Sequence, residues 1–187
     1  MEDPLLNFVT RKSHMEIGEP YFWTSTVYEW KYLLKEDSIK DILISSLSYL
    51  SIKKLISVYG FVIMPNHIHL LWQLNKMNGK EKPNASFQKF TSITIQDVLK
   101  ISNQDQLNLH KVDEHDREHR FWKRDPLASI IESKYGAEKV LDYIHSNPLQ
   151  EHWSLVNNPG DYKYSSAGYY EAGITDWSFI VDYRSRW

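Results

Sequence analysis

The amino-acid sequence predicts a mixed fold of strands and helices, on three observations. Residues 21–30 (YFWTSTVYEW) are rich in aromatic and β-branched residues with rough alternation, which is typical of a strand. Residues 61–63 and 68–74 are apolar runs separated by Met-Pro-Asn, which favours a hairpin because proline cannot donate to a strand ladder. Helical spacing of apolar residues occurs in three further segments, residues 38–56, 86–100 and 132–147.

The expected helices carry recognisable end signals. Ser38 is a candidate N-cap for the first helix, and Gly60 is the signal expected to stop it. Ser86 is the candidate cap of the second helix. Pro148 ends the third helix near Asn147, because the residue before a proline avoids the helical conformation. The first strand is expected to lie beside the second half of the hairpin.

The segments between these elements are polar. Residues 75–85 form a basic loop that is either solvated or in contact with phosphate. Residues 101–120 carry mixed charges and are expected to form a loop or a frayed helix end. Residues 121–126 (FWKRDP) suit either base stacking or a core tryptophan beside solvated basic groups. We expect one domain over residues 1–187.

The composition narrows the classes of function. A chain of 187 residues with 42% hydrophobic and 25% charged residues is ordinary for a globular domain. It has no apolar run of transmembrane length and no signal-peptide pattern, so we expect a cytoplasmic protein without a membrane partner. Cysteine is absent, which excludes disulfides, thiolate metal sites and thiol nucleophiles. The formal net charge of −2 argues against a large nucleic-acid footprint.

Two histidines one residue apart, His67 and His69, lie in the second half of the predicted hairpin. Successive side chains of a strand point to opposite faces, so both imidazoles share one face while Ile68, Leu70 and Trp72 share the other. Two imidazoles side by side form half of a metal site. A pair of half-exposed histidines without a ligand is the alternative that this motif alone leaves open.

A second set of polar residues lies on the helix predicted at residues 132–147. Tyr143 and Asn147 are four residues apart, so they lie on the same side of the helix. Both stand at the margin of its apolar stripe, where a side chain is partly accessible. A core tyrosine and a helix-stopping asparagine are the structural alternatives for these two residues.

Five sequence blocks occur in the order seen in a known family: GFVIMPNHIHLLW, SFQKFTS, RFWKRDP, LDYIHSNP and DYKYSSAGYY. In these blocks, over roughly residues 21–171, the chain resembles the single-tyrosine transposases of the HUH superfamily, especially the REP-associated tyrosine transposases. The resemblance implies the α+β HUH fold, an antiparallel sheet with packed helices of the ferredoxin-like or RRM-like type.

The resemblance also implies roles for individual residues. His67, His69 and Asn147 would bind a divalent metal, Mg²⁺ or Mn²⁺. Tyr143 would be the nucleophile that cleaves and rejoins single-stranded DNA through a 5′-phosphotyrosine, at or near a hairpin, in a homodimer or a monomer. His145 points away from Tyr143 and is expected to be structural or to face DNA. The metal and the tyrosine suit each other chemically. A phenol with a pKa near 10 is a poor nucleophile at neutral pH, so its attack on a phosphodiester needs assistance from a metal or a nearby base.

Lys89, Lys123 and Arg124 are candidate DNA contacts, because basic side chains bind phosphates. Tyr135 and Tyr164 are alternative nucleophiles. Two other functions remain open. One is a domesticated relative that binds hairpin DNA without cutting it, and the other is an unrelated metal-dependent phosphodiesterase that uses the two histidines with a metal-bound water.

Overall fold

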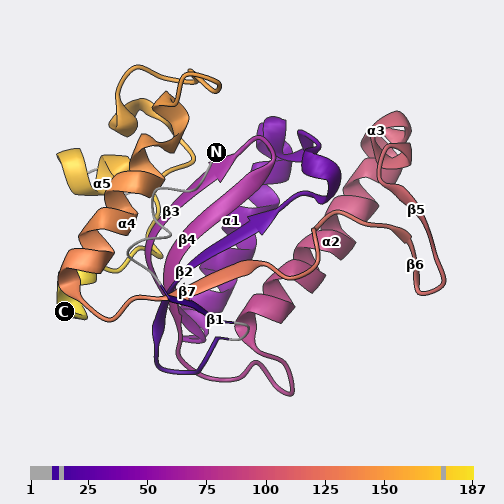
Figure 1. Cartoon of the computed structure of the whole chain (residues 1–187). Helices are drawn as coiled ribbons and strands as arrows, with labels where there is room; N and C mark the ends of the chain where they lie inside the picture. The colour runs from indigo at the N-terminus through magenta and orange to yellow at the C-terminus, as the bar shows by residue number, and fades with distance from the viewer. Residues whose placement is uncertain (1–9, 13–14, 174–175) are drawn as a thin grey trace.

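The computed structural model of the protein describes residues 10–12, 15–173 and 176–187. At its centre lies a five-stranded antiparallel sheet with the strand order β1-β7-β2-β4-β3 (Figure 1). The strands are β1 (Thr10–Lys12), β2 (Pro20–Thr26), β3 (Ile56–Met64), β4 (His67–Leu74) and β7 (Leu127–Ile130). With helices packed on this sheet, the structure has the α+β fold that the sequence predicts.

The connections follow the ferredoxin-like pattern. Helix α1 (Asp37–Ile52) leads from β2 to β3, the β3–β4 hairpin follows, and α2 (Pro83–Ser102) leads on towards β7. Because β4 lies between β2 and β3, this β-α-β-β-α-β path is the split arrangement. Helices α1 and α2 pack on one face of the sheet, whereas α4 (Lys134–Ser146) and α5 (Ala167–Ala172) lie on the other (Figure 1).

Alternation along β4 decides which side chains each face holds. Ile68, Leu70 and Trp72 are fully buried in the core beneath α1 and α2, as predicted. His67 and His69 point to the face covered by α4, where they line a pocket. The predicted hairpin is confirmed, with β3 and β4 paired up to the Pro65-Asn66 turn, and β2 lies beside β4 as expected.

Gly60 allows α4 to lie close to the sheet. It is in β3, next to an irregularity in the pairing with β4, so the expectation that it stops the first helix is wrong. A Cβ atom at this position would lie 2.3 Å from Leu141 Cδ2 on α4. Any residue with a Cβ atom here would therefore require the Leu141 side chain to shift in a closely packed interface.

Several predicted helix ends differ from the structure for local reasons. Helix α1 ends at Ile52, because the apolar residues that follow pair with β4 instead of continuing the helix. Ser38 lies inside α1, whose N-cap is Glu36, so the predicted cap is wrong. Helix α2 begins at Pro83 rather than at Ser86, because the fixed φ of proline suits the first helical position.

Residues 101–120 were expected to form a loop or a frayed helix end; residues 101–102 do end α2, but most of the rest is regular structure. They contain α3 (Gln104–Asn108) and a hairpin of β5 (Lys111–Glu114) and β6 (Arg117–His119), which projects away from the main sheet (Figure 1). Glu114 forms one ion pair within the hairpin, with Arg117, and two with residues that follow it, Arg120 and Arg124. The two strands are polar and mostly exposed, so hydrophobic patterning does not predict them. Strand β7 was not predicted either, because four residues are too few to establish a period.

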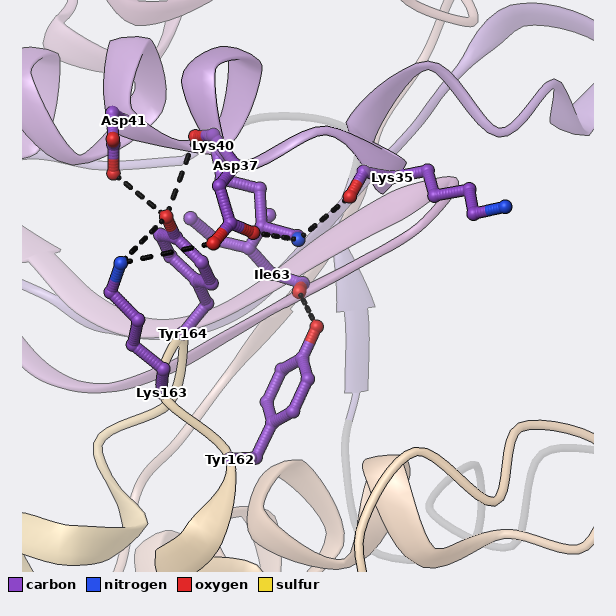
Figure 2. Close-up of polar contacts among 8 residues, drawn as sticks. All are labelled: Lys35, Asp37, Lys40, Asp41, Ile63, Tyr162, Lys163 and Tyr164. Carbon is purple, nitrogen blue, oxygen red and sulfur yellow. Dashed lines mark hydrogen bonds and ion pairs between the residues drawn. The ribbon is translucent and has the colours of Figure 1, made fainter.

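The C-terminal segment is attached to α1 through Tyr164 (Figure 2). Its hydroxyl donates to Asp41 at 2.9 Å, and the ammonium groups of Lys40 and Lys163 lie 4.6 and 4.7 Å from its ring centroid. Burial and the hydrogen bond to Asp41 raise the pKa of Tyr164. The raised pKa makes the phenolate, which is the nucleophilic form, harder to reach than for an ordinary tyrosine, so Tyr164 is a poor candidate for the nucleophile.

The same segment covers the edge of β3. The Ile63 amide donates to the Tyr164 carbonyl at 2.9 Å, and the Ser166 amide donates to the Phe61 carbonyl at 3.0 Å. Tyr162 adds a bond from its hydroxyl to the Ile63 carbonyl at 2.8 Å (Figure 2). These bonds satisfy an otherwise open sheet edge and hold the strand that leads into the histidine turn.

None of the helices in the described residues combines the length and the apolar character that a membrane crossing requires. The longest of them, α2, buries Phe87, Ile95 and Leu99 against the sheet. Its outer side mixes polar residues with the exposed Phe90, Ile93 and Ile101.

We expect Gly60→Ala to destabilise the protein by about 1–3 kcal/mol, because the added methyl group overlaps Leu141 in a closely packed interface. Urea unfolding followed by circular dichroism measures this change. In a Leu141→Ala background the same substitution should cost less, since the smaller side chain leaves room. Strictly additive costs of the two substitutions would contradict the close approach of Gly60 and Leu141.

Candidate functional site

A pocket of about 460 Å³ lies where the beginning of β4 faces the C-terminal end of α4. Its walls come from β2 and the turn after it, from the β3–β4 hairpin, and from α4 with the residues that follow it. All four residues predicted for the chemistry line this pocket: His67, His69, Tyr143 and Asn147. The fold therefore brings together two segments that are about seventy residues apart in the sequence.

His67 and His69 lie side by side, with ring centroids 4.6 Å apart. Their side chains are almost completely enclosed, since the two residues are only 8% and 5% exposed. Burial lowers the pKa of His67 to about 4, and it lowers the pKa of His69 well below its ordinary range. Both imidazoles are therefore neutral at pH 7, which is the form that binds metal ions.

The side chain of Asn66 sets the tautomer of His67. Its Nδ2 donates to the Trp30 carbonyl at 3.3 Å, so its Oδ1 faces His67 Nδ1 at 2.7 Å. An amide oxygen only accepts, so His67 Nδ1 carries the proton and Nε2 keeps its lone pair. The hydroxyl of Thr24 contacts Nδ1 of His69 at 2.7 Å. In both rings, Nε2 is the nitrogen left for another ligand.

Asn147 follows the last turn of α4 and is 2% exposed. Burial lowers the pKa of His67, and the interaction with Asn147 opposes this by raising it. Its Nδ2 has no hydrogen-bond partner among the described residues. Asn147 and His67 line the same pocket, and the amide oxygen and an imidazole nitrogen would both be suitable ligands for a cation held there.

The donor set is unusual because it contains no carboxylate. In the described parts of the chain, no group of three or more His, Cys, Asp or Glu side chains could hold a metal ion. Two imidazoles and one amide oxygen nevertheless fit a divalent cation of the Mg²⁺, Mn²⁺ or Zn²⁺ type, since each is a neutral ligand that offers a lone pair. Such a small set leaves several coordination positions open.

Tyr143 lies against the histidine pair. Its ring is oriented edge to face with the His69 ring, with centroids 5.4 Å apart, and meets the Phe22 ring at 5.9 Å. It is half-buried on α4, beside the buried Val140 and Ile144. These contacts limit the orientations of the ring while it remains part of the pocket wall.

The three basic candidates, Lys89, Lys123 and Arg124, line a second pocket of about 530 Å³ between α2 and the β6 segment. Each of them already has a neighbour. Lys89 and Arg124 form ion pairs with glutamates at 2.8 and 3.3 Å, and the Lys123 ammonium lies 5.7 Å from the Trp30 ring centroid. Trp30 lines the first pocket, so Lys123, which lines the second, lies beside a side chain of the first.

Sequence reasoning missed the residues that support this site. Thr24 lies opposite His69 in the β2–β4 register, a placement that only strand pairing decides. Trp122, the tryptophan of the segment considered for base stacking, is buried, and its Nε1 donates to Thr91 Oγ1 at 3.0 Å. The exposed tryptophan at the pocket of the histidines is Trp30, not Trp122.

His145 lies outside the pocket, on the side of α4 that meets the C-terminal segment. Its Nε2 contacts Ser166 Oγ at 2.8 Å, so it has the structural role that was one of its two expected roles. Burial lowers its pKa from the ordinary 6.5 to about 4. At pH values between these two, the unfolded chain binds a proton that the folded protein does not, so stability is lost as the pH falls from about 6.5 to about 4.

We expect His145→Gln to reduce this acid sensitivity by up to about 1.4 kcal/mol per pH unit within that window. Urea unfolding at a series of pH values compares the slopes of the variant and the wild-type protein. His115→Gln, in the exposed turn between β5 and β6, is the control and should keep the wild-type slope. Identical slopes for all three proteins would show that His145 is not buried in its neutral form.

Comparison with known proteins supports the fold. No family model and no curated protein sequence matches the chain. Among solved structures, the chain is similar to one described as a REP-associated tyrosine transposase bound to a REP hairpin. The TM-score is 0.60 at 16% sequence identity, over 97% of this chain and 93% of the other. At this identity the similarity establishes a common fold, which is the fold that the family resemblance implies.

Proposed function

We propose that the protein is a metal-dependent single-stranded DNA endonuclease and strand transferase of the tyrosine HUH transposase class. The observation that carries the proposal is the convergence of two neutral imidazoles, an amide oxygen and a tyrosine ring in one pocket. The five sequence blocks and the shared fold support it independently. Since the similar structure is described as bound to a REP hairpin, a DNA hairpin is the proposed substrate class.

His67, His69 and Asn147 are the proposed ligands of a divalent cation, Mg²⁺ or Mn²⁺. Their fit to a cation rests on their position in one pocket and on the contacts of Asn66 and Thr24 with the Nδ1 atoms, which leave the two Nε2 atoms for a ligand. A cation held there would polarise a phosphate oxygen and favour ionisation of a nearby phenol. The protein supplies a buried wall that keeps both imidazoles neutral and in position.

Tyr143 is the proposed nucleophile. Its phenolic oxygen forms a bond to phosphorus while the bond from phosphorus to the 3′ oxygen breaks, which gives a 5′-phosphotyrosine and a free 3′-hydroxyl. The phenolic proton goes to water and the departing oxygen takes a proton from water, so the step balances. The contacts with Phe22 and His69 restrict the ring, which favours an in-line approach. Because the new ester conserves the bond energy, a 3′-hydroxyl can reverse the step without ATP.

Lys89, Lys123 and Arg124 are proposed to contact the DNA backbone outside the catalytic pocket. The glutamate partners of Lys89 and Arg124 and the net charge of −2 limit the favourable electrostatic contribution to DNA binding. A phosphate would have to replace a glutamate beside Lys89 or Arg124. We therefore expect a small contact surface with salt-sensitive affinity rather than a broad basic face.

Wild-type protein incubated with labelled hairpin oligonucleotides and Mn²⁺ should form a protein–DNA adduct that survives denaturing electrophoresis. Tyr143→Phe should reduce the adduct by more than about a thousandfold, because it removes the attacking oxygen. Tyr135→Phe is the matched control, since Tyr135 is an exposed tyrosine on the same helix. Tyr164→Phe is a second control, and both control variants should retain the adduct.

The outcomes separate the competing functions. An adduct formed by Tyr143→Phe would show that another residue is the nucleophile. Cleavage by the wild-type protein without any adduct would instead favour a phosphodiesterase that uses water. A mobility shift without cleavage would favour a hairpin-binding protein that has no catalytic activity.

Calorimetric titration with MnCl₂ should detect a site that His67→Ala and His69→Ala abolish. Asn66→Ala should weaken Mn²⁺ binding by about 10- to 100-fold, because His67 loses the partner that sets its tautomer. Asn147→Asp should strengthen binding, since a carboxylate adds a negative charge to the ligand set. His145→Gln changes a half-buried histidine outside the pocket and should bind Mn²⁺ like the wild type. Unchanged affinity in His67→Ala would refute the proposed site.

A further inference from the structure

Exposed aromatic rings surround the rim of the catalytic pocket. Trp30 and Tyr32 are 58% and 61% exposed, although large aromatic side chains are mostly buried. Both line the pocket that holds His67, and Trp153 lines it as well. The Trp153 ring lies 5.8 Å from the Tyr32 ring and 6.0 Å from the His67 ring. Open aromatic faces beside a polar pocket are suited to a flat ligand.

The backbone at Trp30 is held in an unfavourable conformation. Glu29 and Trp30 have φ angles of 55° and 57°, in the left-handed region that strains residues with a Cβ atom. The Trp30 carbonyl accepts from the Asn66 side chain, and the Val27 amide donates to the Asn66 carbonyl at 2.8 Å. The histidine hairpin thus holds the turn that presents Trp30 at the pocket.

Lys123 places a positive charge beside the same ring. Its ammonium lies 5.7 Å from the Trp30 ring centroid, and its amide donates to the Thr26 carbonyl at 2.8 Å. The main chain of Lys123 is therefore fixed to the end of β2, close to the pocket wall. An aromatic face next to an ammonium group suits an unpaired nucleotide, because the ring stacks on the base and the ammonium binds a phosphate.

We infer that Trp30, together with Tyr32 and Lys123, forms a stacking site for an unpaired base adjacent to the phosphate that Tyr143 attacks. The inference rests on the proposed function, because it specifies how that pocket holds its nucleotide. Such a site selects single-stranded DNA, since a base within a duplex is stacked between its neighbours and has no free face. If these rings were instead a binding site for a protein partner, DNA binding would not depend on stacking of a base on Trp30. An oligonucleotide without bases therefore belongs to the test.

The test measures binding of a labelled oligothymidylate of about 12 nucleotides by fluorescence anisotropy in EDTA, where no cleavage occurs. Trp30→Ala should weaken binding by about 5- to 150-fold, the range for one stacked base. Trp30→Phe should retain most of the affinity, whereas Trp30→Leu should lose as much as the alanine variant. Tyr49→Ala is the matched control, because Tyr49 is 54% exposed on α1 and lines a different pocket.

An oligonucleotide of the same length made of abasic sites identifies what Trp30 recognises. The wild type and Trp30→Ala should bind it equally, and thermal unfolding should show that both proteins are folded. Equal affinity of these two proteins for oligothymidylate would overturn the inference, as would an equally large loss of affinity for the abasic strand.

The two proposals fail in different ways. A phosphotyrosine adduct combined with oligothymidylate binding that does not depend on Trp30 would leave the proposed function intact and remove the stacking site. Binding that depends on Trp30 without any adduct would keep the stacking site and remove the catalytic function.

Discussion

The pairing of β4 with β2 and β3 is the constraint on which the rest of the site depends. Its register places His67 opposite Thr26 on one side and Met64 on the other, and it places His69 opposite Thr24. A shift of one residue would turn both imidazoles into the apolar core beneath α1 and α2. The buried Ile68, Leu70 and Trp72 make such a shift costly, so core packing determines where the polar groups point.

Packing of α4 on the opposite face completes the pocket. Gly60 lets Leu141 approach the sheet, and this position of the helix brings Tyr143 and Asn147 to the histidines. The C-terminal segment reinforces the arrangement from the edge of β3 through main-chain bonds and the Tyr162 hydroxyl. Enclosure on these sides removes water from the imidazoles, and this desolvation keeps them neutral.

The charge distribution bears on how the proposed DNA substrate would be bound. Lys89 and Arg124 are each paired with a glutamate, which reduces the positive charge that these two side chains present in the second pocket. The exposed rings of Trp30 and Tyr32 offer a different source of affinity, because stacking depends less on the net charge of the protein. Recognition would then rest on unpaired bases more than on the phosphate backbone, consistent with a single-stranded substrate.

The sequence by itself determined the features that depend on local periodicity: strands β2, β3 and β4, the hairpin, the shared face of His67 and His69, and the spacing of Tyr143 and Asn147. Strands β1 and β7 escaped it, because they are short and depend on partners distant in sequence. The β5–β6 hairpin escaped it because its strands are polar. The predicted starts of two helices were wrong because Glu36 and Pro83, rather than serines, mark them. Only the tertiary structure decided that Trp30 is exposed while Trp122 is buried, and that the Nδ1 atoms of His67 and His69 are the ring nitrogens engaged by Asn66 and Thr24. The hydrogen bonds of Asn66 and Thr24 and the burial of each ring join segments that no sequence period connects.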